Sequence, residues 1–157
     1  MNIDNTTTLY QDPSLIIATF PVGELEVNSV LIYSPQSGSA ISIDPGDDHQ
    51  QFLKIVANKK LKVQLLLHTH AHFDHIGASE IIAKKLNVPI LLHPLDYPIY
   101  QHLADQGKFV GKKIPTPAPL NEFLDEQQIY ALKDTNQLIT SISVLHTPGH
   151  SPGHCCF

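Results

Sequence analysis

The sequence predicts an α/β domain, and two patterns of apolar residues are the basis for this prediction. Apolar and polar residues alternate over 15–20, 25–33 and 39–44, which indicates three short antiparallel strands separated by turns. Helical and extended patterns then alternate from residue 48 to residue 106. A meander followed by alternating strands and helices is typical of a sheet that helices cover. A chain of 157 residues suits one such domain, so we expect residues 1–157 to form a single unit.

The elements after the third strand follow from periodicity. The motif Asp44-Pro-Gly ends the third strand in a turn. An apolar stripe predicts a helix over 48–60, and the nearly continuous apolar run 61–67 predicts a strand covered on both faces. Residues 107–119 contain three prolines and no periodicity, so we expect a surface loop there, a candidate lid. The remaining expected elements are a helix at 77–86, a strand at 89–93, a helical stretch at 95–106 and a strand at 138–147.

Composition excludes several classes of protein. The chain is 42% hydrophobic and 16% charged with a net charge of −5, which is typical of a globular protein whose partner is not a nucleic acid. No apolar segment approaches the roughly 20 residues that a membrane-spanning helix requires, so no membrane partner is expected. The first 14 residues do not resemble a secretory signal, and we expect a cytoplasmic protein. Cys155 and Cys156 are adjacent, which is poor geometry for a disulfide between them.

A dense group of histidines follows the apolar run. The segment HTHAHFDHIG contains four histidines and one aspartate. A buried imidazole nitrogen needs a partner, and a metal ion is the usual one when so many rings gather. His70 and His72 lie two apart, which directs both rings to one side of an extended chain. Asp74 and His75 follow in the turn before the next helix, so the segment could supply one pair of ligands to each of two adjacent ions.

A second histidine cluster follows the predicted strand at 138–147. It contains His146, His150 and His154, and His150 is the candidate third imidazole. Ligand crevices form at the carboxyl ends of strands in α/β sheets. The prolines and glycines around His150 would fix a tight loop that can approach a metal closely. A zinc ion held by three histidines keeps a fourth position for water and lowers the pKa of that water to about 7.

Both segments resemble motifs of a known superfamily. THAHFDHIG resembles the H-x-H-x-D-H signature of the metallo-β-lactamase superfamily, and HTPGHSPGH resembles the next ligand loop of its glyoxalase II-like hydrolases. The resemblance covers essentially the whole chain. It implies an αββα sandwich of two mixed sheets, of which this chain covers the first half and the start of the second. It also implies a first metal bound by His70, His72 and His150 and a second bound by Asp74 and His75, with zinc expected and iron or manganese as alternatives.

The resemblance also implies ligands that this chain does not contain. In the superfamily the second metal takes a bridging aspartate and a late histidine from the segment after the PGH loop, and this sequence stops at Phe157. We therefore expect a C-terminally incomplete domain. An uncovered inner sheet face would expose an apolar patch and an open edge, which favour association. The chain would then either pair with another copy of itself, forming a homo-oligomer, or be a truncated form of a longer enzyme.

Three functions are compatible with the resemblance. The leading one is a metal-dependent hydrolase of the glyoxalase II-like type, in which metal-bound hydroxide attacks a thioester or related acyl bond of a small-molecule substrate and Asp74 orients the nucleophile. The second is a mononuclear non-haem iron dioxygenase resembling persulfide dioxygenases, whose two-histidine-one-carboxylate site would need the absent aspartate. The third is a truncated metal-binding remnant without catalysis.

Simpler roles remain open for the individual residues. Asp74 could only cap the following helix, and His150 could be a turn residue between prolines. Asp44 could orient a ligand histidine or only form its turn. Lys112 and Lys113 could attract an anionic substrate or form a solvated pair. Structural or outer-sphere roles are expected for His68, His146 and His154, and surface or capping roles for His49, His93 and His102.

Overall fold

A six-stranded sheet is the centre of the computed structural model, which describes residues 5–120, 122–135 and 137–157. The strands lie in sequence order; β1 to β4 are antiparallel, whereas β4, β5 and β6 are parallel. The predicted opening meander is therefore confirmed, and the parallel pairing of the later strands is a finding of the structure. The strands are β1 (Thr7–Gln11), β2 (Ile16–Val22), β3 (Val27–Tyr33), β4 (Ser39–Ile43), β5 (Lys62–Leu67) and β6 (Ile90–Leu91).

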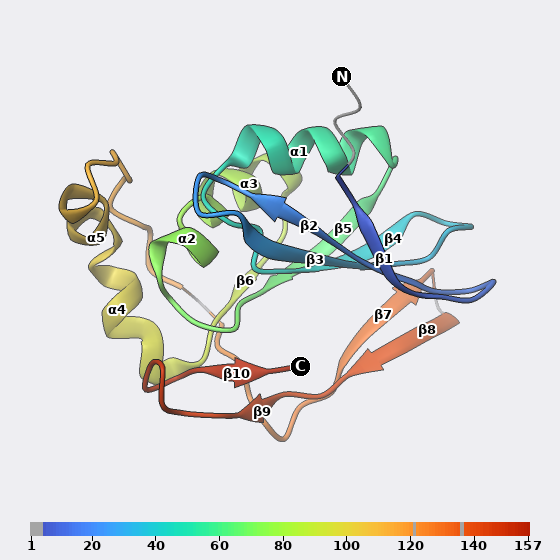
Figure 1. Ribbon diagram of the computed structural model, residues 1–157. Helices are drawn as coiled ribbons and strands as arrows, with labels where there is room; N and C mark the ends of the chain where they lie inside the picture. The colour runs from blue at the N-terminus through green and yellow to red at the C-terminus, as the bar shows by residue number, and fades with distance from the viewer. Residues whose placement is uncertain (1–4, 121, 136) are drawn as a thin grey trace.

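Two helices cover one face of this sheet. They are α1 (His49–Asn58) and α3 (Ser79–Leu86), and both lie on the same side of the sheet in Figure 1. Helix α1 begins where the Asp48 carboxylate accepts hydrogen bonds from the first-turn amides, a common N-cap. Its apolar stripe buries Phe52, Ile55 and Val56 against the sheet. The amphipathic pattern of the sequence thus predicted the helix but only part of its buried face. Phe52 and Val56 lie in the predicted stripe, whereas Ile55 does not, and Ala57 of that stripe is exposed.

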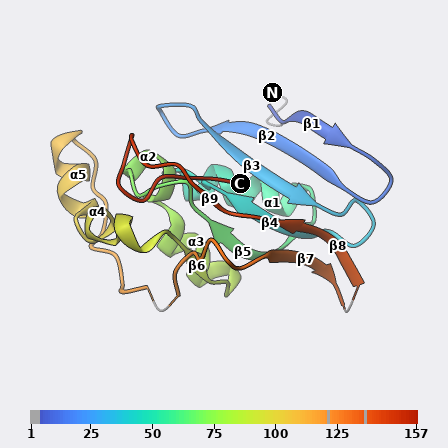
Figure 2. The same cartoon turned by 90° about the horizontal axis from the view of Figure 1, so that it is seen from below.

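A second β layer lies against the opposite face of the sheet. It consists of the hairpin β7 (Tyr130–Asp134) and β8 (Gln137–Ile142) and of the pair β9 (Leu145–His146) and β10 (Cys155–Cys156). Figure 1 shows these strands beneath the sheet, and Figure 2 shows β7, β8 and β9 from below. Residues such as Ile41, Leu67 and Leu132 fill the core between the layers. This order of helices, sheet and second β layer is the one that the resemblance implied for the first half of the sandwich and the start of the second.

Part of the inner sheet face stays open beside β8. A hollow of about 450 Å³ lies there, bordered by side chains of β2, β3, β4 and β8 and by Phe157. Leu15, Ile17 and Val30 are among its apolar walls. Pairing of two copies over this face stays a prediction.

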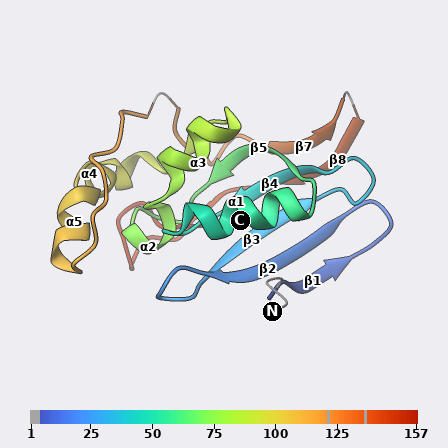
Figure 3. The ribbon, with the colours of Figure 1, turned by 90° about the horizontal axis from the view of Figure 1, so that it is seen from above.

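Short helices gather at one end of the molecule, as Figure 3 shows for α4 and α5. They pack around a third core that contains Ala71, Ile76, Leu92, Tyr100 and Leu103. Because Ala71 belongs to the histidine segment, this core anchors the segment to the helices. The elements are α2 (Phe73–Ile76), η1 (Pro94–Asp96), α4 (Tyr97–Gln101) and α5 (Leu103–Phe109).

Several predicted elements differ in extent from those observed. The stretch 95–106 is broken into η1, α4 and α5, and α5 runs to Phe109, into the expected loop. The predicted strand 138–147 is interrupted between the end of β8 at Ile142 and the start of β9 at Leu145. Because Ile142 and Val144 are both buried, the apolar alternation continues through the break and does not reveal it. Strands β1 and β7 were not predicted; every residue of β1 is exposed, so it lacks an apolar pattern.

Two findings concern membrane-spanning helices and the cysteines. No helix within the described residues is long and apolar enough to cross a membrane. Cys155 is buried and Cys156 is exposed, and both are free thiols. Burial raises the pKa of the Cys155 thiol to about 11, which makes it unreactive at neutral pH.

Candidate metal centre

The candidate site lies at the carboxyl edge of the three parallel strands. Asp44 directly follows β4, His70 comes three residues after β5, and Asp96 ends η1 after β6. Parallel strands end at the same edge of a sheet, so the segments that follow them meet there. The fold therefore gathers polar side chains from three separate parts of the chain at one place.

His70, His72 and His150 form a compact group of imidazoles. Each offers one ring nitrogen, and these three atoms lie within 4.8 Å of one another. The His72 Nδ1 atom is 3.0 Å from the His150 Nε2 atom, and the His70 ring centroid is 4.7 Å from those of both other rings. Zinc–nitrogen bonds are about 2.0–2.1 Å long, so only small movements would close the three nitrogens onto one ion. The structure brings together all three histidines predicted for the first metal.

The His70 ring has one satisfied nitrogen and one unsatisfied nitrogen. Its Nδ1 atom lies 2.9 Å from the Thr69 hydroxyl, which donates to the Asp44 carboxylate at 2.6 Å. Its Nε2 atom is buried and has no hydrogen-bond partner among the described residues. A buried nitrogen without a partner costs free energy, and a bound ion would remove that cost. The orphaned nitrogen and the all-imidazole donor set together fit a divalent metal such as zinc.

Asp74 and His75 lie beside this group. The His75 ring centroid is 4.1 Å from that of His70, and its Nε2 atom is 3.6 Å from an Asp74 oxygen. The other ring nitrogen, Nδ1, is 2.9 Å from the Asp44 carboxylate. Asp44 therefore fixes the orientation of the His75 ring, which answers the open question about its role. A carboxylate behind a ligand histidine typically fixes its tautomer and raises its basicity.

The turn after β4 explains how Asp44 reaches this position. Asp44 has a positive φ of 49°, a conformation that aspartate tolerates better than most residues. Gly46 follows with a φ of 85°, and a Cβ atom there would lie 2.2 Å from a Val22 methyl carbon. Only glycine fits this position without displacing β2. The Asp44-Pro-Gly motif is thus the local sequence that directs the carboxylate into the site.

The environment favours the neutral form of His70 and His72. Burial, with a further contribution from His75, lowers the pKa of His70 to about 3. Burial and the nearby His150 also lower the pKa of His72. For His75, burial acts downward, but the hydrogen bond and charge of Asp44 and the charge of Asp74 outweigh it and raise the pKa. Metal ligation requires the neutral imidazole, which His70 and His72 already present at pH 7.

Two further histidines, His68 and His154, have structural partners. His68 is fully buried, with its Nε2 atom 2.7 Å from the Ser79 hydroxyl and its Nδ1 atom 3.2 Å from the Leu91 carbonyl oxygen. It therefore ties β5 to α3 and to the end of β6. His154 lies 2.9 Å from the Thr147 hydroxyl through Nδ1, within the loop that carries His150.

His93 and His146 form a second imidazole pair near Glu126. Their rings are stacked with centroids 4.3 Å apart, and the Glu126 carboxylate lies 3.9 Å from one and 4.0 Å from the other. Parallel rings direct their in-plane lone pairs side by side, which is poor geometry for a shared ion. His93 is buried and accepts a hydrogen bond from the Leu95 amide, so the expected capping role holds but a surface position does not.

A groove beside the centre has apolar walls. It has a volume of about 540 Å³ and runs past His72 and Asp74. Phe109 is 93% exposed and Leu25 is 60% exposed along it. The residues that line the groove are Leu25, His72, Phe73, Asp74, Gln106, Phe109 and Val110.

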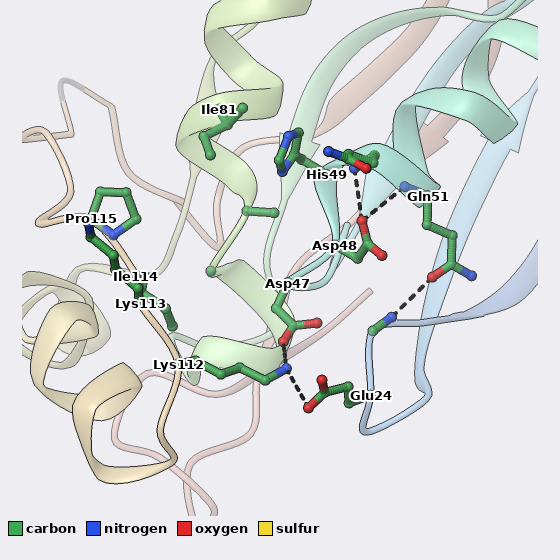
Figure 4. Close-up of a pocket in the computed structure, with 14 residues that line it drawn as sticks. Glu24, Asp47, Asp48, His49, Gln51, Ile81, Lys112, Lys113, Ile114 and Pro115 are labelled. Carbon is green, nitrogen blue, oxygen red and sulfur yellow. Dashed lines mark hydrogen bonds and ion pairs between the residues drawn. The ribbon is translucent and has the colours of Figure 1, made fainter.

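A larger pocket lies on the other side of α2, and Figure 4 shows its polar lining. Its volume is about 740 Å³. Lys112 of the proline-rich loop forms ion pairs there with Asp47 and Glu24, and its amino group lies 5.7 Å from the centre of the Phe73 ring. Lys112 therefore fastens this loop to the rest of the domain, instead of offering a free charge to an anionic substrate.

The sequence patterns did not predict the roles of Thr69 and Asp96 in the site. Thr69 connects Asp44 to the His70 ring, and Asp96 accepts hydrogen bonds from both segments that carry the grouped histidines. Both residues come shortly after parallel strands. The rule that polar residues after such strands meet at one edge could have identified them.

Comparison with known proteins agrees with this geometry. The family model described as the metallo-beta-lactamase superfamily matches residues 22–157, and the chain belongs to that superfamily. It is 35% identical to an uncharacterized protein of Aquifex aeolicus (strain VF5) over 90% of this chain and 64% of that protein. It is 31% identical to hydroxyacylglutathione hydrolase GloC of Haemophilus influenzae, again over 90% of this chain and 65% of the relative.

A solved structure shows the same fold. The crystal structure of TTHA1623 in a di-iron-bound form is 33% identical, with a TM-score of 0.71 over 86% of this chain and 63% of the other. The chain thus spans slightly less than two thirds of the length of these relatives. The fold and the family model thus agree on the metallo-β-lactamase superfamily.

Proposed function

We propose that this chain carries the metal centre of a glyoxalase II-like hydrolase that cleaves a thioester or a related acyl bond. The observation that supports this most is the buried, unpartnered His70 Nε2 atom within the group formed with His72 and His150. The name of the Haemophilus relative, a hydroxyacylglutathione hydrolase, supports a thioester as the substrate class. Zinc is the proposed ion, and the di-iron form of TTHA1623 keeps iron as the alternative.

Each polar residue has a proposed part in the chemistry. His70, His72 and His150 would hold the first ion, and Asp74 and His75 would contribute to a second. A bound divalent ion supplies a Lewis acid for the carbonyl oxygen and lowers the pKa of water. Asp74, with a side chain 21% exposed, is open to the groove and can accept the proton of an attacking water. Asp44 keeps the His75 ring in place while this happens.

The apolar groove is the proposed binding place for the organic part of the substrate. Gln106 of α5 accepts a hydrogen bond from the Phe73 amide and donates to the Ala71 carbonyl oxygen. These bonds fix α5 beside the histidine segment, so Phe109 stands next to Asp74 and His72. Exposed apolar side chains beside a polar reaction centre suit a ligand with an apolar group next to its acyl bond.

Replacing Asp74 with asparagine should separate catalysis from binding of the first ion. The amide keeps the size of the side chain but cannot accept a proton, and loss of such a group typically lowers the rate roughly 10²- to 10⁴-fold. We expect this loss in kcat for a hydroxyacyl-glutathione thioester, measured by release of the free thiol, with binding of one zinc ion retained. The matched control is Asp105→Asn, because Asp105 is an exposed residue of α5 paired with Lys108. Equal kcat values for Asp74→Asn and the wild-type chain would refute the assigned role.

Replacing Phe109 with alanine should weaken substrate binding and leave the chemical step intact. Partial contact with an aromatic ring contributes on the order of 1 kcal/mol, so KM for a thioester with an apolar acyl group should rise roughly three- to tenfold. The matched control is Leu138→Ala, because Leu138 is 56% exposed on β8, outside the groove. The groove is not the substrate site if both variants give the same KM.

Metal-dependent activity tests the proposal against the two alternatives. The chain is freed of metal and reloaded with zinc, manganese or iron(II), and thiol release and oxygen consumption are both measured. The proposal predicts thiol release that depends on the metal and no oxygen uptake. Oxygen uptake with iron alone would favour the dioxygenase, and a chain that binds metal without either reaction would be a non-catalytic remnant.

A further inference from the structure

One buried carboxylate joins the two segments that carry the grouped histidines. Asp96 is fully buried. Its Oδ2 atom accepts hydrogen bonds from the Ala71 amide at 3.0 Å and from the Ser151 hydroxyl at 2.7 Å. Its Oδ1 atom accepts one from the Gly153 amide at 2.6 Å. Ala71 stands between His70 and His72, and Ser151 directly follows His150, so a single side chain contacts both segments.

The place of Asp96 in the fold explains how it reaches both segments. It follows β6 at the end of η1, and its own amide donates to the His93 carbonyl oxygen at 3.0 Å. Removing a carboxylate from water is costly unless hydrogen bonds replace the lost hydration. Three hydrogen bonds to the one carboxyl group provide that replacement. The three bonds therefore fix the orientation of the Asp96 carboxylate and also the positions of the groups that donate them.

The loop around His150 depends on this carboxylate for its position. The His150 side chain is exposed, and several hydrogen bonds of its loop are internal, such as those from Gly149 to Ser151 and from Thr147 to His154. Outside these internal bonds, the loop donates hydrogen bonds to Asp96, and the amide of the adjacent Cys155 donates to the Thr69 carbonyl oxygen at 2.8 Å. A loop without regular structure regains about 1–2 kcal/mol of conformational freedom for each residue released.

Gly153 shows how closely the loop approaches Asp96. A Cβ atom at position 153 would lie 2.7 Å from the Asp96 amide nitrogen and 2.9 Å from its Oδ1 atom. These separations are shorter than ordinary van der Waals contacts, so a larger residue would force the loop away. Glycine at this position and aspartate at 96 thus form one complementary contact.

We propose that Asp96 is a positioning residue that holds His150 at metal-binding distance from His70 and His72. The inference rests on the proposed function to the extent that these three histidines bind an ion. Asp96 does not belong to the group of ligand atoms formed by His70, His72 and His150; it contacts the backbone and the serine hydroxyl of the segments that carry them.

The test is Asp96→Asn, which keeps the shape of the side chain and replaces one acceptor oxygen by an amide group. Whichever way the amide faces, either the Ala71 or the Gly153 amide loses its acceptor. We expect zinc affinity, measured by competition with a chromophoric chelator, to fall roughly 10- to 100-fold, the usual effect of losing an outer partner of a metal site. In the metal-free protein, hydrogen exchange should become faster over residues 146–154.

Two further variants separate positioning from general loss of stability. Val56→Ala removes buried methyl groups from the core under α1 and lowers the unfolding temperature without touching either segment. Ser151→Ala removes one of the three bonds and keeps both backbone bonds, so its loss of zinc affinity should be the smaller one. The proposal is supported if Asp96→Asn lowers the zinc affinity most, Ser151→Ala lowers it less, and Val56→Ala leaves it unchanged.

The outcomes also separate this inference from the proposed function. If Asp96→Asn binds zinc like the wild-type chain, or no more weakly than Val56→Ala, Asp96 has no positioning role. If the wild-type chain binds no zinc, the proposed function fails, and hydrogen exchange in the metal-free variants still decides the inference. Unchanged exchange over 146–154 in Asp96→Asn would then overturn it, and faster exchange confined to the two segments would support it.

Discussion

His70→Ala should leave the chain unable to retain zinc through purification. His70 is the buried member of the three-histidine group, and its Nε2 atom has no hydrogen-bond partner among the described residues. Loss of a direct ligand should cost more than the roughly 10- to 100-fold in affinity that loss of an outer partner costs. The methyl group of alanine also leaves an empty space that water can enter, but water cannot replace the fixed geometry of the ring.

Elemental analysis and chelator competition measure this effect. His102→Ala is the matched control, because His102 is an exposed histidine whose Nδ1 atom lies 2.8 Å from the Pro98 carbonyl oxygen, outside the candidate centre. It should bind zinc like the wild-type chain. If His70→Ala retained the same zinc content as this control, the three-histidine group would not be the metal site.

Phe52→Ala should lower the free energy of unfolding by about 3–5 kcal/mol. Phe52 is fully buried in the core between α1 and the sheet, with its ring centroid 6.2 Å from that of Phe20 on β2. The variant removes the aromatic contact and leaves a cavity that the surrounding strands cannot fill. Since native domains are typically stable by only about 5–15 kcal/mol, the variant should be close to unfolding at 37 °C.

Urea unfolding followed by circular dichroism measures this loss. Gln50→Ala changes an exposed residue of the same helix and should shift the free energy of unfolding by less than about 0.5 kcal/mol. A loss below about 1 kcal/mol for Phe52→Ala would mean that α1 does not pack on the sheet through this side chain.

Much of the fold could be predicted because its elements have strong local patterns. The alternation around Val27–Tyr33 and the stripe of α1 each show which face is buried, and both elements are where the sequence places them. Strand β1 has no buried face, so its pairing with β2 comes from backbone hydrogen bonds that no side-chain pattern reports. The breaks between α4 and α5 and between β8 and β9 depend on tertiary packing in the same way.

The candidate site could be predicted in part for a similar reason. The spacing of His70 and His72 lies within one short segment, so their shared direction follows from local geometry. That His150 meets them depends on the second β layer folding beneath the sheet. Its place after a predicted strand and the resemblance of its loop made it a candidate ligand, but neither contains the packing that brings it to His70 and His72. The role of Asp96 depends on two contacts with segments distant in sequence, which no local pattern contains.

The central claim is that His70, His72 and His150 bind one ion, and X-ray absorption at the zinc edge tests it most directly. The measurement uses the chain purified without a histidine tag and loaded with one equivalent of zinc. The account predicts three imidazole nitrogens at about 2.0–2.1 Å, with one of them lost in His150→Ala. A zinc environment of oxygen atoms alone, or a spectrum that His150→Ala leaves unchanged, would contradict it.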